Sequence, residues 1–153
     1  MRMPAIFAAV LLLAIFPAAA QTHRIDDSAS QVLDGALRLK WNERIPHGSQ
    51  AYLASGQTTV LARLDVSPWK GRQARIYLRL PEQPGGQFNA TWTTQGRLMP
   101  GTLRSGERTL VYAGPIQTDM IEDTLRLLIE VDTRRMSRDE QLAFSFEIDL
   151  GTP

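Results

Sequence analysis

Apolar and polar residues alternate one by one in several separate stretches of this chain. The clearest stretch is 142–150, where large apolar residues alternate with Ala143, Ser145, Glu147 and Asp149. A period of two predicts a strand with one face in a core and the other in water. The same pattern recurs at 60–66, 74–80 and 125–131, and more weakly at 37–41 and 88–92.

Glycine and proline stand between these stretches and predict the turns. Gln95-Gly96 and Ser105-Gly106 each separate two short apolar runs, so we expect hairpins whose strands pair antiparallel. The run 109–113 is apolar on both sides, which is typical of a central strand covered on both faces. Helical signals are confined to single turns at 27–33, 118–122 and 137–140.

These patterns predict an all-β fold: a single antiparallel β-sandwich, immunoglobulin-like or similar, of about seven or eight strands with one to three short helical turns. A soluble closed barrel is the nearest alternative. An outer-membrane barrel is less favoured, because most of the predicted strands are shorter than the 9–11 or so residues that such barrels use.

The N-terminus has the layout of a cleaved secretory signal peptide. Arg2 precedes a run of about a dozen apolar residues, and Ala18-Ala19-Ala20 stands before the polar Gln21. We therefore expect residues 1–20 to be removed, 21–35 to form a partly flexible N-terminal segment and 36–150 to form the sandwich. The apolar run breaks at Pro17, which is too early for a membrane span, so we expect no span after cleavage.

Composition excludes several classes of function. The chain has no cysteine, which rules out thiol nucleophiles, disulfides and cysteine metal sites. Without Arg2, sixteen basic residues balance sixteen acidic ones, which argues against binding to nucleic acid or to anionic membranes. The exported chain of about 130 residues is enough for one domain with one core.

Candidate catalytic and metal-binding residues are few. His23 and His47 are the only histidines, and neither has partner ligands at metal-binding spacing, so we expect no metal and no cofactor. Ser49 lies close to His47 but is not part of a G-x-S-x-G motif. The acidic pairs at 122–123 and 139–140 lie at predicted turns, where carboxylates are favoured for structural reasons.

The candidate binding residues are arginines and aromatics on predicted outward faces. Arg75, Tyr77 and Arg79 share one face of a strand, and we expect Arg63 to lie on the strand beside it. Trp69 lies in an exposed-looking turn and is the best candidate anchor for a partner. A solvated face of ion pairs is the structural alternative.

The sequence therefore predicts an exported, non-enzymatic protein, periplasmic or extracellular, that acts by binding or assembly. Its partner would be a protein or a glycan of the cell envelope. The second hypothesis is a subunit of a surface fibre that assembles by strand exchange. It requires an extended N-terminal donor with alternating apolar residues, and it ranks second because residues 21–34 offer only Ile25, Val32 and Leu33 as large apolar groups. The third is a small envelope hydrolase that uses loop carboxylates.

Overall fold

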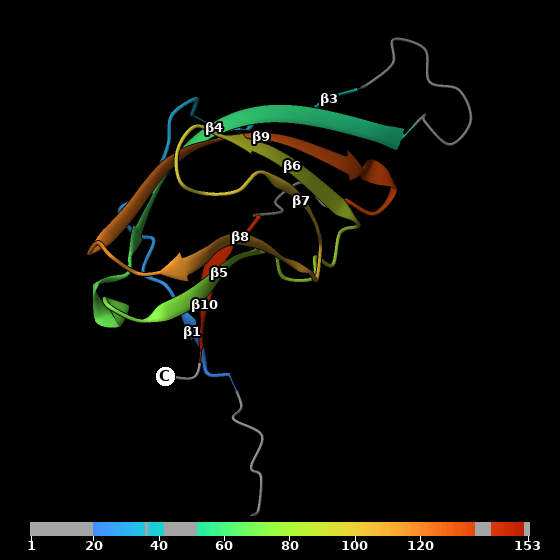
Figure 1. Ribbon diagram of the computed structural model, residues 1–153. Coiled ribbons are helices and arrows are strands. Elements are labelled where there is room, and N and C mark those ends of the chain that lie inside the picture. Colours follow the sequence, from blue (N-terminus) through green and yellow to red (C-terminus); the bar gives the residue numbers. More distant parts are fainter. Residues whose placement is uncertain (1–19, 36, 42–51, 137–141, 152–153) are drawn as a thin grey trace, which may run out of the picture.

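The computed structural model describes residues 20–35, 37–41, 52–136 and 142–151, and in it two antiparallel sheets pack face to face (Figure 1). The first sheet, sheet A, has the strand order β1-β10-β5-β8. Its strands are β1 (Thr22–Arg24), β5 (Gln73–Arg79), β8 (Arg108–Pro115) and β10 (Ser145–Leu150). The expectation of an all-β antiparallel sandwich is confirmed.

The second sheet, sheet B, has the order β2-β4-β9-β6-β7, and β3 also pairs with β4. Its strands are β2 (Gln31–Val32), β3 (Lys40–Trp41), β4 (Leu53–Asp65), β6 (Phe88–Thr94), β7 (Gly101–Arg104) and β9 (Met120–Asp132). In Figure 1 β4 and β9 cross the top of the molecule and bend down at one end toward sheet A.

The long pair β4–β9 forms the centre of sheet B. It runs in unbroken antiparallel register from Leu53 opposite Asp132 to Asp65 opposite Met120. Most even-numbered residues of β4 and all odd-numbered residues of β9 from 121 to 131 are buried, so both strands present one face to the core. The alternation read from 60–66 and 125–131 is confirmed by this burial.

The core lies between the two sheets and follows the period of two. β5 contributes Ala74, Ile76 and Leu78, and β10 contributes Phe146 and Ile148. The facing residues of sheet B are equally buried: Ala62, Leu64, Phe88, Ala90, Trp92, Leu103, Leu125, Leu127, Ile129 and Val131. Leu142 and Phe144 are half-buried and pack at the margin of this core.

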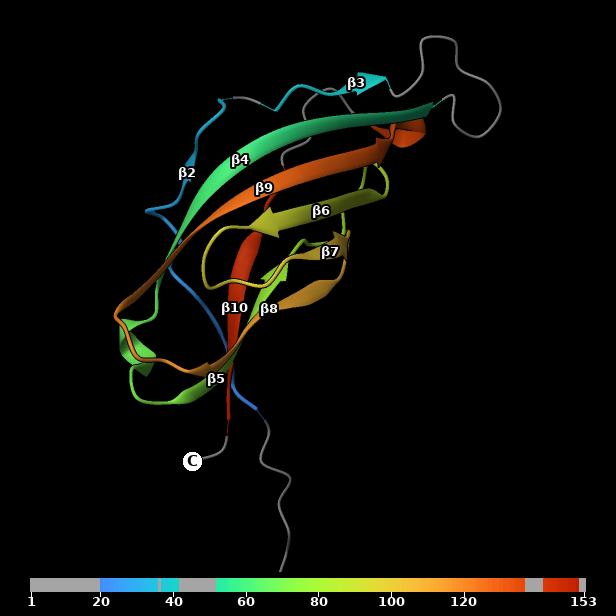
Figure 2. The same cartoon turned by 45° about the horizontal axis from the view of Figure 1, so that its top comes forward.

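The N-terminal segment joins the two sheets along one side of the sandwich (Figure 2). β1 pairs with β10 of sheet A, and a bridge between Asp26 and Asp65 leads to β2, which pairs with β4 of sheet B. Between these contacts Ile25 is 1% exposed and lies in the core. The segment 21–35 therefore supplies strands to both sheets, beyond the sandwich boundary that the sequence predicts.

One of the two predicted hairpins is right and the other is wrong. β6 and β7 pair antiparallel around Gln95-Gly96, although six residues rather than a tight turn connect them. β7 and β8, on either side of Ser105-Gly106, lie in different sheets and do not form a ladder. The chain therefore crosses from sheet B to sheet A at this turn, and the two strands contribute the buried residues Leu103 and Val111 to the core from different sheets.

The prediction of a central strand at 109–113 is also wrong, because β8 is an edge strand of sheet A. Its cover comes from the neighbouring sheet: the backbone N–H of Met99 donates to the carbonyl of Val111 at 2.7 Å. The Thr109 hydroxyl donates to the carbonyl of Thr102 at 2.6 Å. These contacts with the β7 region occupy part of the edge of β8, and of its residues only Val111 is fully buried.

Two short 3-10 turns occur in the described residues, at Ser67–Trp69 (η2) and Thr133–Arg135 (η3). The turn predicted at 118–122 is wrong, since β9 begins at Met120. The one predicted at 27–33 is instead a tight turn followed by β2, closed by a hydrogen bond from the backbone N–H of Ser30 to the carbonyl of Asp27 at 2.9 Å. Residues 137–140 lie outside the described residues. In the described part of the chain, no helix has the length and apolar character needed to cross a membrane.

Candidate functional site

The outer surface of sheet A carries three of the predicted binding residues. Arg75, Tyr77 and Arg79 alternate along β5 with the buried residues Ala74, Ile76 and Leu78. Side chains two residues apart on a strand point to the same side of the sheet. The prediction that these three residues share one outward face is confirmed.

The neighbouring strand β10 supplies the acidic residues of this surface. Asp149 stands opposite Arg75 in the ladder, and Glu147 stands opposite Tyr77. Both carboxylate side chains are only 14% exposed, whereas the Arg79 side chain beside them is 49% exposed. Arg79 Nη1 donates to Glu147 Oε1 at 2.7 Å, so this carboxylate is held close to the sheet beneath the guanidinium.

Arg108, from β8 on the other side of β5, completes this arrangement. Its Nη1 and Nη2 donate to the two carboxylate oxygens of Asp149 at 3.2 and 2.9 Å. Its guanidinium carbon also lies 4.1 Å from the centre of the Tyr77 ring. A bidentate carboxylate contact and a cation–π contact both fix the plane of the guanidinium. Hydrogen bonding to Asp149 raises the pKa of Arg108, against the effect of burial.

Asp149 is the most constrained acid of this surface. Burial alone would raise the pKa of Asp149, but hydrogen bonds from Arg108 and Thr22, together with the charges of Arg108 and Arg75, lower it below its ordinary value. The Thr22 hydroxyl on β1 donates to Asp149 Oδ1 at 2.6 Å. This carboxylate therefore stays charged and ties β1, β10 and β8 together.

The surface keeps an excess of positive charge. We call it the arginine face, and its residues are Arg24, Arg75, Tyr77, Arg79, Arg108, Glu147 and Asp149. Four arginines face two carboxylates. Among the described residues, the side chains of Arg24 and Arg75 form neither a hydrogen bond nor a salt bridge, so their guanidinium donors are open to solvent.

Sequence reasoning missed Arg24 and Arg108 for two different reasons. Arg24 falls in a segment that was expected to be partly flexible, with too few residues to show a period. Arg108 directly precedes the predicted strand 109–113, but only the strand order places it against Tyr77 and Asp149. Alternation identifies the face on which a residue lies, and it does not identify the neighbouring strand.

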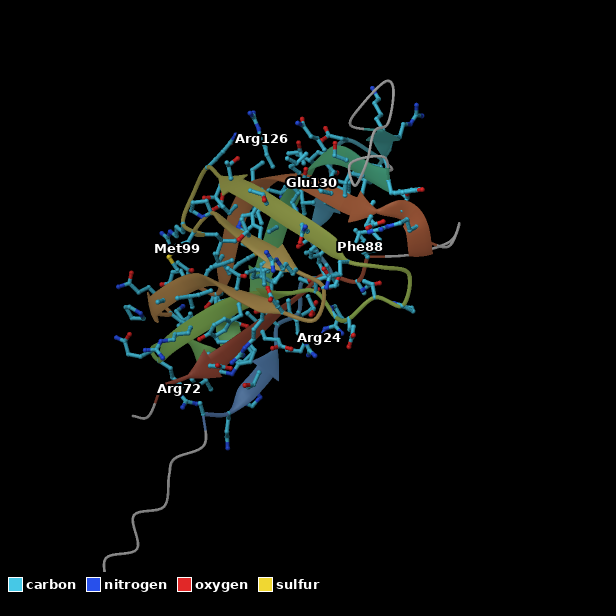
Figure 3. All side chains as sticks on the ribbon, turned by 90° about the vertical axis from the view of Figure 1, so that its right-hand side faces the viewer. Arg24, Arg72, Phe88, Met99, Arg126 and Glu130 are labelled. Atoms are coloured by element: carbon cyan, nitrogen blue, oxygen red, sulfur yellow. The ribbon has the colours of Figure 1, made fainter. Side chains whose placement is uncertain are left out.

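Arg63 does not belong to the arginine face, and its predicted place beside Arg75 is wrong. It lies on β4 of sheet B, where its Nε donates to Glu122 Oε2 at 2.7 Å. After Asp65 the chain passes through η2 into β5, which belongs to the other sheet. Figure 3 shows Arg126, another arginine of sheet B, far from Arg24 and Arg72.

Trp69 is a half-buried residue of η2 that packs against the core. Its ring centre lies 5.9 Å from that of His23. His23 is part of β1, so it does not lie in the loose tail that the sequence suggested. The two rings cover one end of the core, which accounts for a tryptophan in this turn without a partner.

The remaining candidate catalytic residues have structural roles or lie outside the described residues. Glu122 pairs with Arg63, and Asp123 is buried and accepts hydrogen bonds from several backbone N–H groups. His47, Ser49 and the pair at 139–140 fall outside the described residues. Within the described ranges, no group of three or more His, Asp or Glu residues could hold a metal ion.

A cleft that sequence reasoning did not find lies at one end of sheet B. Its volume is about 1090 Å³. It is lined by the start of β6 and the loop before it, the end of β9, the start of β4 and residues of two turns: Leu53, Glu82, Gln83, Pro84, Gly86, Gln87, Asn89, Ser105, Glu130, Val131, Asp132 and Arg134. Figure 3 shows Glu130 and Phe88, which mark this end of sheet B. The loop residues have no period, so the sequence carries no signal for this cleft.

Comparison with known proteins gives no relative: no family model, curated protein or solved structure matches this chain.

Proposed function

We propose that this chain is an exported binding protein of the cell envelope, and that its arginine face recognises an anionic polymer. The observation that carries the proposal is the constrained geometry of this face. Glu147 and Asp149 hold Arg79 and Arg108 in place, while Arg24 and Arg75 keep their donors open. Because Arg79 and Arg108 are already held in place, they lose little side-chain entropy when a carboxylate, sulfate or phosphate group binds beside them, and Arg24 and Arg75 supply the open donors.

Binding can be tested with the chain that begins at Gln21. The probes are a heparin-derived octasaccharide and poly-glutamate, which carry sulfate and carboxylate groups respectively, titrated at two salt concentrations. We expect at least one of them to bind, with an affinity that falls as salt rises, since exposed charge contacts are screened. If neither polyanion binds at low salt, the proposal is wrong.

The binding variant is Arg24→Ala combined with Arg75→Ala. Each arginine that contacts an anionic group contributes about a tenfold change in affinity, so the double variant should bind roughly a hundredfold more weakly. Arg126→Ala is the matched control, because Arg126 is also an exposed strand arginine but lies on sheet B. Equal losses in both variants would indicate a nonspecific charge effect and would count against the arginine face.

Export rests on the signal-peptide pattern and needs its own test. The full chain can be expressed in a bacterium with a Sec pathway, and the product in the periplasm or medium analysed by intact mass. We expect the product to begin at Gln21. A cytoplasmic product that still carries Met1 would overturn this part of the proposal.

Strand exchange is a second candidate function, and one contact favours it. β1 and β2 are edge strands of their sheets, and Ile25 between them inserts into the core. The same segment of a neighbouring copy could take the edge positions of β1 and β2 and place its own Ile25 in this core, as in β-strand addition. Size-exclusion chromatography separates the two candidates, because a strand-exchanging subunit forms species that grow with concentration and a simple binding module stays at one size.

A further inference from the structure

The cleft at the end of sheet B has rigid walls. The backbone N–H of Gly106 donates to the carbonyl of Leu80 at 2.8 Å, and that of Leu80 donates to the carbonyl of Glu107 at 3.2 Å. From the same turn, the Ser105 hydroxyl accepts from the backbone N–H of Phe88 at 3.0 Å. The turn at 105–107 is therefore tied both to the start of the 80–87 loop and to the beginning of β6.

The lining of the cleft is dominated by amide and carboxylate groups. Asn89 and Glu130 stand opposite each other in the β6–β9 ladder, and both lie on the outer side of sheet B. Glu82 and Gln87 come from the loop. None of these four side chains forms a hydrogen bond or ion pair within the described part of the chain, so their donors and acceptors are open to a ligand.

Among the described residues that line the cleft, the one cation, Arg134, is already engaged. Arg134 is paired with Asp132 through its Nε and Nη2, and its guanidinium carbon lies 5.4 Å from the centre of the Tyr52 ring. Glu82 and Glu130 then leave the cleft with negative charge. It repels the anionic groups that suit the arginine face, so the two surfaces select ligands of different chemistry.

We propose that this cleft binds a neutral oligosaccharide. Sugar hydroxyls donate to carboxylates and both donate to and accept from amides, so the lining matches their hydrogen-bonding capacity. The volume of about 1090 Å³ lies just above the roughly 300–1,000 Å³ range for ligand sites, which favours several sugar rings over one. This site is separate from the arginine face and does not depend on the function proposed for it.

The chain from Gln21 is applied to an array of neutral oligosaccharides that includes chitohexaose, cellohexaose and maltohexaose, and the retained glycan is titrated by calorimetry. Asn89→Ala and Glu130→Gln are the site variants. Thr91→Ala is the control, since Thr91 is exposed on the same face of β6 but does not line the cleft. We expect at least a tenfold loss of affinity in each site variant and no change in the control.

Arg75→Ala distinguishes the two proposals, because it should leave the affinity for the neutral glycan unchanged while it weakens polyanion binding. Thermal midpoints of all variants exclude misfolding as the cause of a loss. The proposal is overturned if the array retains no neutral glycan, if spermine binds in its place, or if the site variants bind as the unmodified chain does.

Discussion

The carboxylate of Asp123 lies directly against Gly96, whose backbone N–H donates to its Oδ1 at 2.8 Å. A Cβ atom on residue 96 would stand 3.0 Å from Asp123 Cγ, so only glycine allows this approach without displacement. Oδ1 also accepts from the backbone of Gln95 and Thr124, and Oδ2 accepts from Leu98. One buried carboxylate thus organises the whole connection between β6 and β7.

Replacement of this carboxylate should destabilise the folded protein. Asp123→Asn turns one acceptor into an NH₂ group that faces backbone N–H donors. We expect the free energy of unfolding to fall by about 2–3 kcal/mol, measured by urea denaturation. The control is Glu122→Gln, where an exposed ion pair with Arg63 is lost and about 0–1 kcal/mol is expected. Similar losses in the two variants would show that Asp123 does not organise the loop.

Gly56 allows another close contact, on the inner side of sheet B. A Cβ atom there would lie 2.7 Å from the carbonyl oxygen of Arg38 and 2.9 Å from Leu37 Cδ1. Gly56→Ala should therefore displace this stretch and lower stability by about 1–3 kcal/mol. At Gly151 the nearest atoms are 3.6 Å away, so Gly151→Ala is a suitable control. Thermal unfolding of both variants checks the prediction, and equal midpoints would contradict it.

Thr58 is a place where the protein can be stabilised. It is 8% exposed, and its hydroxyl is the one buried side-chain polar atom without a hydrogen-bond partner in the described residues. Thr58→Val keeps the shape of the side chain and removes the unpaired group, so we expect a gain of about 1 kcal/mol in urea denaturation. Thr58→Ser keeps the hydroxyl and loses a methyl group, and should be less stable than the unmodified chain.

The long strands of this fold could be predicted from the sequence, because alternation directly reports a sheet with one dry face. β5, β10, residues 60–65 of β4 and residues 125–131 of β9 are examples. β1 and β2 could not, since strands of two or three residues have no measurable period, and β3 covers only the end of the stretch predicted at 37–41. Their pairing depends on where the tertiary fold brings a neighbouring edge.

Strand order was the information that the candidate site needed and the sequence lacked. Arg63 and Arg75 are close along the chain, yet the chain changes sheet between them. Arg75 and Asp149 are far apart along the chain and stand opposite each other. Contacts between distant segments are set by sheet packing, which leaves no local pattern in the residues.

Ile25 tests whether the N-terminal segment is part of the fold. It is 1% exposed, whereas Val32 in the same segment is 55% exposed. Ile25→Ala should lower the free energy of unfolding by about 2–4 kcal/mol, because it leaves a cavity in the core. Val32→Ala should change it by no more than about 0.5 kcal/mol. Equal effects in urea denaturation would mean that the segment is not held in the core in solution.

The arginine face should make stability depend on pH through Asp149. Its pKa is lowered in the folded protein, for the reasons given above, from an unfolded value of about 3.9. A depressed carboxyl pKa contributes stability above the unfolded value, and this contribution is lost as pH falls through the folded value.

Asp149→Asn removes the charge at every pH. The variant should be less stable than the unmodified chain at pH 7, and the difference should shrink steadily below about pH 4, where the native carboxyl also becomes neutral. Urea denaturation at several pH values between 7 and 2 measures this difference. Asp119→Asn, in an exposed pair with Lys70, should show only a small difference at pH 7. If the difference in free energy of unfolding between Asp149→Asn and the unmodified chain stays constant down to pH 2, the charge of Asp149 does not hold Arg108 and Thr22 in place. Packing and uncharged hydrogen bonds would then account for their positions.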